Sequence, residues 1–259
     1  MLEWFDRTAR TLATGFCFAI FGLGELALAF VIFPLLMVFM RDKDKRGRVA
    51  KYVIHKSFRA FVELMRVTGA LDYETRHLER LDRPGLLVLA NHPTLIDVVF
   101  LISFIRQADC IVKDALLSNP FTRYAILAGG FIRNMGAEAL VERCGTSMAE
   151  GNVFIIFPEG TRSEPDGIGE LQRGAAHIAV RNKRDITPVT IRVSEHNLGR
   201  NSRWWKVPKR RVRFEFEVCE DIQIVPFLEA QPEAPAAARE LTKYLTRYFT
   251  ERIGAHGTA

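Results

Sequence analysis

The sequence predicts an α/β fold, in which helices flank a largely parallel sheet, with an N-terminal helical membrane anchor. From residue 71 onwards, short apolar runs typical of buried strands alternate with longer helical segments. Upstream, the thirty residues 11–40 carry a single charge, Glu25. Two of the apolar runs end in polar turns, and open α/β sheets bind their ligands at the carboxyl ends of strands.

Residues 1–70 are expected to form membrane-anchoring helices. One membrane span needs about 20 apolar residues. Residues 11–40 therefore suit one tilted helix or a shallow re-entrant pair broken near Gly22, Gly24 and Pro34. Glu25 is costly in lipid, so we expect it to face another helix, the interface or protein. A signal peptide cleaved after Ala29 is the rival interpretation, but eleven more uncharged residues follow that position.

A basic segment, residues 41–51, follows the apolar stretch directly. Fewer positive charges precede the stretch, so the positive-inside bias predicts that the C-terminal domain lies on the cytoplasmic side of the membrane. Residues 49–70 have the periodicity of an amphipathic helix that ends at Gly69 and either lies on the membrane or packs on the body. Four of its basic residues are expected on the surface: Lys51, Lys56, Arg59 and Arg66.

Residues 71–259 are predicted to form the α/β domain. Strands are expected near 71–75, 86–90, 110–113, 152–157, 186–193 and 211–218. Helices are expected near 96–107, 115–128, 137–150 and 173–183. A linker-like segment, 231–235, precedes a last helix that ends at Gly254 and is expected to dock on the sheet.

The sequence Asn-His-Pro-Thr-Leu-Ile-Asp, residues 91–97, connects a predicted strand to a predicted helix. On one straight helix, His92 and Asp97 would lie about 140° apart, on different faces. The two side chains can therefore meet only if the chain turns between them. Pro93 supplies such a turn, because it disfavours the helical conformation at His92. A buried Asp that accepts from one imidazole nitrogen leaves the other free as a base. A capping Asp beside an unrelated His is the alternative.

A second predicted strand, residues 152–157, runs into the polar sequence Pro-Glu-Gly-Thr-Arg-Ser at 158–163. Together, NHPTLID and FPEGTRS resemble the signature of the lysophospholipid acyltransferase family, best known for acylating 1-acylglycerol-3-phosphate. That family has Asn-His, four spacers and Asp, followed further along by Phe-Pro-Glu-Gly-Thr-Arg. The resemblance covers roughly residues 85–190.

The resemblance implies a role for each matching residue. His92 would be the base and Asp97 its orienting partner, while Gly160, Thr161 and Arg162 would bind the acceptor. Glu159 would either contact the glycerol of the acceptor or order the loop. Arg133 matches an Arg that ends a Gly-rich family block, although the usual Asp-Arg ending is absent; a solvated surface Arg is the alternative. Leu171 and Thr187 replace a usual Phe and Val, changes that would reshape the pocket without altering the chemistry. The departures around Arg133 and Leu171 leave acylation of a different hydroxyl open.

The implied reaction moves a fatty acyl group from a thioester to a hydroxyl. The sequence has no Ser in a G-x-S-x-G nucleophile elbow, so the acceptor's own hydroxyl would attack the thioester directly. The donor would be acyl-CoA or acyl carrier protein, and no other cofactor is expected. The scattered cysteines argue against a disulfide framework and a metal site: Cys17, Cys110, Cys144 and Cys219.

The net charge of +6 favours anionic partners. Seven basic residues lie between Arg200 and Arg213, with Trp204 and Trp205 among them, and suit a membrane interface or an acidic carrier protein. A solvated hairpin is the plainer interpretation. Nucleic-acid binding rests on charge alone and does not explain the long apolar segment.

The sequence therefore predicts a membrane-associated O-acyltransferase that acylates a lysophospholipid, 1-acylglycerol-3-phosphate before others, in phospholipid biosynthesis. The partners it implies are a lipid membrane, the lysophospholipid acceptor and the acyl donor. Acylation of a specialised glycolipid or a lipid-linked product is one alternative. A catalytically silent lipid-binding protein is another, although such a protein has no chemical need for both His92 and Asp97.

Overall fold

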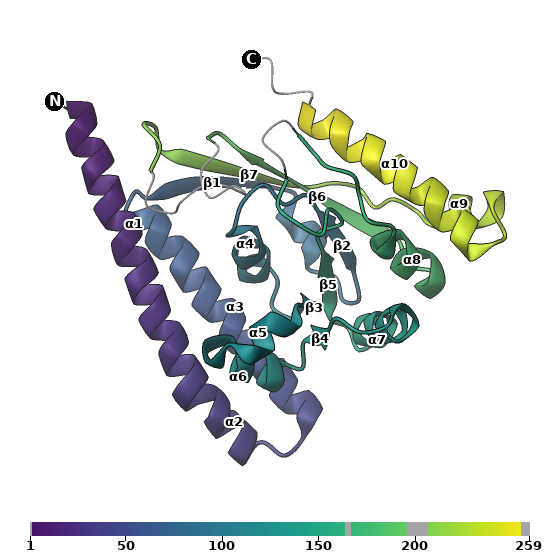
Figure 1. The fold of residues 1–259 in the computed structure, drawn as a ribbon, viewed down its shortest axis with the longest axis horizontal. Helices are drawn as coiled ribbons and strands as arrows, with labels where there is room; N and C mark the ends of the chain where they lie inside the picture. The colour runs from purple at the N-terminus through teal and green to yellow at the C-terminus, as the bar shows by residue number, and fades with distance from the viewer. Residues whose placement is uncertain (1, 164–166, 196–206, 255–259) are drawn as a thin grey trace.

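A computed structural model describes residues 2–163, 167–195 and 207–254, and it confirms the predicted α/β fold (Figure 1). Within the described residues, one mixed sheet has the strand order β1-β7-β6-β2-β5-β3-β4. Neighbouring strands are parallel except β6 and β7, which are antiparallel. The strands are β1 (Leu71–Arg76), β2 (Leu87–Ala90), β3 (Ala108–Val112), β4 (Ile132–Arg133), β5 (Val153–Ile156), β6 (Ile186–Val193) and β7 (Val212–Val218).

Helices cover both faces of the sheet (Figure 1). One face carries α3 (Lys43–Val67), α4 (Asp97–Phe104) and α6 (Pro120–Gly129), with α5 (Asp114–Ser118) beside α6. The other face carries α7 (Ala137–Ala149), α8 (Arg173–Asn182), α9 (Val225–Ala230) and α10 (Ala234–Gly254). A 3-10 helix, η2 (Leu78–Leu81), connects β1 to β2 in the chain.

Strand β2 lies at the centre of the sheet and is buried on both faces. Val88 and Ala90 pack into the core under α3 and α4, whereas Leu87 and Leu89 pack into the core under α8 and α10. Strand side chains alternate between faces, so a central parallel strand needs apolar residues at every position. Because β2 is fixed on both sides, the loop that follows it starts from a rigid position.

The N-terminal segment is one continuous helical run, made of α1 (Leu2–Ala27), a π-helical turn, η1 (Leu28–Ile32), and α2 (Phe33–Phe39). Gly22 and Gly24 do not interrupt it. The π turn directly precedes Pro34, which lacks an N–H and whose ring would clash with the preceding turn of an α-helix. The run from Asp6 to Phe39 is long and apolar enough to cross a membrane.

The apolar side of this run faces outward, and the other side packs on α3. The exposed side chains include Leu12, Phe16, Ile20, Leu23, Phe30, Leu35 and Phe39. On the packed side, the rings of Phe21 and Phe61 stack with centroids 4.3 Å apart. The Glu25 carboxylate accepts a hydrogen bond from Ser57 Oγ on α3 at 3.0 Å, so it faces another helix, one of the predicted alternatives. An outward apolar surface of this length indicates membrane association.

Helix α3 begins at Lys43, six residues before the predicted start, because the Asp42 carboxylate accepts from the backbone N–H groups of Asp44 and Lys45 and caps the helix. The prediction that Lys51 lies on a basic surface was wrong. Lys51 is 7% exposed, and its Nζ donates to Asp109 Oδ2 at 3.0 Å and to Asn152 Oδ1 at 3.2 Å. The helical period predicts a surface position for Lys51, but the residue is buried because its counter-ion, Asp109, lies on β3.

We expect Lys51→Met to lower the free energy of unfolding by about 3–5 kcal/mol, because it leaves the buried Asp109 carboxylate without its cation. Lys45→Met, at an exposed position on the same helix, is the matched control and should change it by less than about 0.5 kcal/mol. Chemical denaturation of the purified full-length chain measures both. Equal stability of the two variants would show that the ion pair is dispensable.

One other predicted element differs from the structure, and two observed elements were not predicted. The helix expected over 115–128 is two helices, α5 and α6, because Pro120 disfavours a helical conformation at Asn119. Strand β4 and helix α9 were not predicted, since both are short. The division into an anchor (1–70) and a domain (71–259) stays a prediction. Residues 200–206 of the basic segment with both Trp lie outside the described residues.

Candidate functional site

The two polar turns lie side by side at one edge of the sheet. Strand β2 ends at Ala90 and the neighbouring parallel strand β5 ends at Ile156, so the segments that follow leave from the same edge. Residues 91–96 lead from β2 into α4, and residues 157–172 lead from β5 towards α8. The parallel pairing thus brings the NHPTLID and FPEGTRS motifs, far apart in the chain, to one place.

His92 and Asp97 meet across the turn at Pro93. His92 Nδ1 lies 2.8 Å from Asp97 Oδ2. Asp97, the first residue of α4, is fully buried, whereas the His92 side chain is 19% exposed. Complete burial raises the pKa of the Asp97 carboxyl, and hydrogen bonds from His92 and Thr94 oppose that rise. The pair combines a shielded carboxyl with an imidazole that is open to a ligand.

The contacts of Asp97 determine which imidazole nitrogen carries the proton. Asp97 Oδ2 accepts the backbone N–H of Thr94 at 2.6 Å, and Oδ1 accepts the Thr94 hydroxyl at 2.5 Å. With Asp97 ionised, its oxygens can only accept hydrogen bonds, so His92 Nδ1 is the donor in its contact with Oδ2. Nε2 of a neutral His92 is then the unprotonated nitrogen and can accept a proton. Thr94 was not predicted as a site residue; no pattern in the sequence marks it.

The loop that follows β5, residues 157–163, makes three contacts with His92. The His92 backbone N–H donates to Glu159 Oε1 at 2.9 Å, and its carbonyl accepts from the Ser163 N–H at 2.8 Å. The imidazole stacks on the ring of Phe157, with centroids 4.2 Å apart and planes inclined by 25°. The position of His92 therefore depends on residues of the 157–163 loop as well as on its own.

Glu159 links the two loops rather than lying open to a ligand. It is 6% exposed, and Oε1 also accepts the Ser163 hydroxyl at 2.7 Å. Oε2 accepts the Gly169 N–H at 3.4 Å. These contacts occupy both oxygens of the carboxylate with protein donors. The predicted contact of Glu159 with the acceptor stays a prediction, and the geometry supports a positioning role.

Glu159→Gln is expected to lower kcat for acyl transfer by roughly tenfold or more while changing the acceptor KM little. The new amide nitrogen would face an N–H or O–H donor in place of an acceptor, which disturbs the His92 loop. Steady-state kinetics of the purified variant separate the two constants. A raised acceptor KM at unchanged kcat would instead place Glu159 in contact with the acceptor.

The remaining predicted residues of this loop lie on its outer side. Gly160 has a φ of +67°, a conformation that favours glycine, and its N–H donates to Phe157 O at 3.1 Å in a tight turn. Gly160 and Thr161 are exposed, and Arg162 is half-buried. Since the next residue, Ser163, is hydrogen-bonded to His92 O, the backbone of Arg162 lies beside the His92 loop.

Arg133 lies further along the same edge. It ends β4, which is separated from β5 by β3. Its side chain is exposed, and Nη2 lies 3.4 Å from Asp114 Oδ1. The structure therefore does not join Arg133 to the loops that hold His92, and its predicted role in acceptor binding stays a prediction.

Asn91 belongs to the NHPTLID motif but was not predicted as a site residue. Its side chain donates to Ile191 O at 2.8 Å and accepts from Ile191 N–H at 2.7 Å, which fixes the end of β2 to β6. Among the described residues, no group of three or more His, Cys, Asp or Glu side chains is placed to hold a metal ion.

The sequence profile of the family described as Acyltransferase matches residues 72–192. The 1-acyl-sn-glycerol-3-phosphate acyltransferase of Pseudomonas aeruginosa is 26% identical over 237 residues, which cover 87% of this chain and 83% of that protein. A chloroplastic 1-acyl-sn-glycerol-3-phosphate acyltransferase of Arabidopsis thaliana is 27% identical over 115 residues, 42% of this chain and 32% of the relative. The crystal structure of a 1-acyl-sn-glycerophosphate acyltransferase from Thermotoga maritima has the same fold, with a TM-score of 0.68 and 20% identity over 99% of this chain and 98% of that one.

Proposed function

Because the chain belongs to the acyltransferase family, we propose that it transfers a fatty acyl group from a thioester donor to the hydroxyl of 1-acylglycerol-3-phosphate. The observation that carries this proposal is the His92–Asp97 pair, held at 2.8 Å beside the loop of Arg162. The name of the Pseudomonas relative supports the choice of acceptor. The donor is acyl-CoA or acyl carrier protein.

In the proposed reaction, His92 Nε2 takes the proton of the acceptor hydroxyl as its oxygen attacks the thioester carbonyl carbon. The new C–O bond forms, the C–S bond breaks, and the thiolate leaves with the proton returned by His92. Asp97 holds the imidazole in the required tautomer and stabilises the transient imidazolium. Arg162 binds the acceptor phosphate, for which the planar guanidinium offers two parallel N–H groups.

The proposed setting is a membrane surface, with the catalytic site on the cytoplasmic side. The exposed apolar run of α1, η1 and α2 supports the proposed membrane association. The basic segment that follows this run, residues 41–51, supports a cytoplasmic position of the catalytic site, because positive charge next to a membrane span favours the cytoplasmic side. An acceptor that stays in the membrane would then meet a base held at its surface.

The acceptor is tested by Arg162→Lys, which keeps the charge but loses the planar fork. We expect the KM for 1-acylglycerol-3-phosphate to rise roughly tenfold, while the donor KM changes little. An acceptor without phosphate should be poor for the wild type and less affected by the substitution. Arg181→Lys, on the exposed side of α8, is the matched control.

Efficient use of a phosphate-free acceptor by the wild type would contradict this choice of acceptor. It would favour acylation of a different hydroxyl, such as that of a glycolipid or a lipid-linked product. A uniform loss with all acceptors in Arg162→Lys would instead indicate that Arg162 stabilises the loop.

A further inference from the structure

A concave site lies away from His92, between α3, β1 and the C-terminal end of α4. We call it the α3–β1 groove. Its cavity measures about 520 Å³, within the range of small-molecule sites. None of its lining residues comes from the two loops at the carboxyl ends of β2 and β5. It is lined by Arg59, Val62, Glu63, Arg66, Tyr73, Glu74, Thr75, Arg76, Leu78, Ser103 and Phe104.

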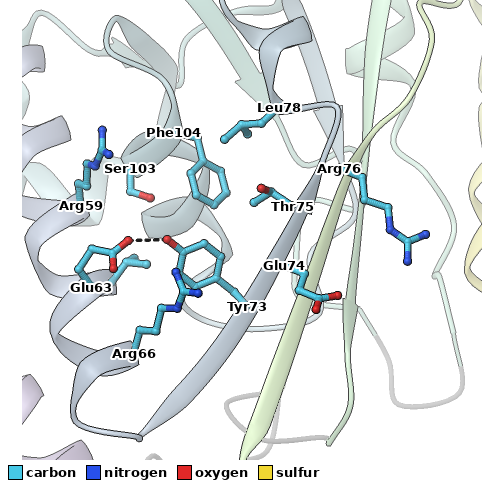
Figure 2. Close-up of a pocket in the computed structure, with 11 residues that line it drawn as sticks. Arg59, Glu63, Arg66, Tyr73, Glu74, Thr75, Arg76, Leu78, Ser103 and Phe104 are labelled. Atoms are coloured by element: carbon cyan, nitrogen blue, oxygen red, sulfur yellow. Dashed lines mark hydrogen bonds between the residues drawn. The ribbon is translucent and has the colours of Figure 1, made fainter.

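Figure 2 shows how the charged residues of the groove are arranged. Arg59, Glu63 and Arg66 project from α3 beside Tyr73 of β1, whereas Glu74 and Arg76 point away from them. Side chains alternate along a strand, so residues 74 and 76 lie on the other face of β1. Glu74 forms an ion pair there with Arg213 of β7. The charges on the α3 side of the groove are therefore two guanidinium groups and one carboxylate.

The carboxylate is already engaged. The Tyr73 hydroxyl donates to Glu63 Oε1 at 2.5 Å, and burial, followed by this hydrogen bond, raises the pKa of Tyr73, which keeps the hydroxyl protonated. The Arg66 guanidinium lies over the Tyr73 ring at 5.0 Å and is 3.6 Å from an Asp72 oxygen. Within the part of the chain that the structure describes, Arg59 forms no hydrogen bond or ion pair.

The positive charge continues along the exposed side of α3. Lys56 Nζ and Arg106 Cζ lie 5.5 and 5.3 Å from the ring centre of Tyr52. Burial lowers the pKa of the buried His55 next to them, and the charges of Lys56, Arg59 and Arg106 lower it further, whereas the hydrogen bond with Ile102 O opposes the shift. The cations beside the groove favour an anionic ligand.

We propose that the α3–β1 groove binds a phosphate-bearing ligand through Arg59 and Arg66. These residues lie two helical turns apart, about 10 Å along α3, and guanidinium groups bind phosphate oxygens in a bidentate manner. Val62, Leu78 and Phe104 give the groove an apolar wall for the part of the ligand next to the phosphate. Two ligands of the proposed function have this chemistry: a phospholipid headgroup and the nucleotide part of a CoA thioester.

This inference rests on the proposed function only for the choice of ligands. The test uses the purified full-length chain in detergent, with coenzyme A and a short-chain phosphatidate as probes. Hydrogen–deuterium exchange in peptides that cover Arg59–Arg76 follows occupancy of the groove itself, separately from the loops of His92 and Arg162. No turnover is needed, so failure of the acyl-transfer proposal would leave this readout unchanged.

At least one probe should protect these peptides in the wild type, and Arg59→Gln should weaken its binding roughly tenfold. Glu63→Gln should strengthen binding, because it removes the opposing charge. Arg181→Gln, which removes the same charge from the exposed side of α8, outside the lining of the groove, is the matched control and should leave binding unchanged. If Arg59→Gln weakens the binding of coenzyme A alone, the ligand is a nucleotide. If it weakens the binding of phosphatidate alone, the ligand is a lipid headgroup. No protection by either probe, or equal binding by Arg59→Gln and the wild type, would overturn the proposal.

Discussion

Replacing His92 by alanine is expected to lower kcat for acyl transfer by roughly 10²–10⁴-fold, the usual cost of losing a general base. The His92 ring is partly exposed and stacks on Phe157, so its removal takes away a proton acceptor without opening the core. The Asp97 carboxylate keeps its two hydrogen bonds from Thr94. Steady-state kinetics of the purified variant, with thermal unfolding as a check on folding, measure the effect.

His177→Ala provides the matched control for this experiment. His177 is half-buried on α8, away from the turn that joins β2 to α4. The His177→Ala variant should retain the wild-type kcat. That result would show that the fall in kcat of His92→Ala comes from the position of the histidine and not from the type of substitution. Activity of His92→Ala equal to that of the control would exclude His92 as the base.

The second large effect is expected from Asp97→Asn, which should lower kcat by about 10³-fold. In Ser-His-Asp triads, the same change of Asp to Asn favours the wrong imidazole tautomer. Here both Asp97 oxygens accept hydrogen bonds from Thr94, and one of them also accepts from His92 Nδ1. An amide supplies a single acceptor oxygen, so at least one of these donors would lose its partner.

A double variant shows whether the two residues act as one unit. If Asp97 acts only through His92, the variant with both substitutions should be no slower than His92→Ala alone. Losses that multiply would mean that Asp97 contributes independently of the imidazole. Circular dichroism of each variant distinguishes this result from unfolding, to which a change at a fully buried residue is prone.

The sequence predicted a turn at Pro93, which allows the His92 and Asp97 side chains to meet, but these residues alone left open a capping Asp beside an unrelated His. The structure places the two side chains 2.8 Å apart. The predicted strands near 86–90 and 152–157 correspond to β2 and β5, and parallel pairing brings their following loops together. The catalytic and binding roles assigned to these residues remain predictions.

The features that the sequence did not reveal depend on which side chains meet in space. Lys51 follows the period of a basic helix surface, and only the fold places it against Asp109. The contacts of Glu159 with the His92 loop arise because β2 and β5 are neighbours, which no local pattern specifies. The α3–β1 groove combines residues of α3, β1 and α4, so no motif marks it.

The most direct test of the proposed reaction is the product formed by the purified full-length chain. The chain is incubated with 1-acylglycerol-3-phosphate and either acyl-CoA or acyl carrier protein, and the lipids are identified by mass spectrometry. We predict that phosphatidate accumulates with at least one donor in the wild type and falls to the background level in His92→Ala. Absence of phosphatidate with both donors, or equal amounts from the wild type and His92→Ala, would contradict the assignment of His92 as the base of this acyl transfer.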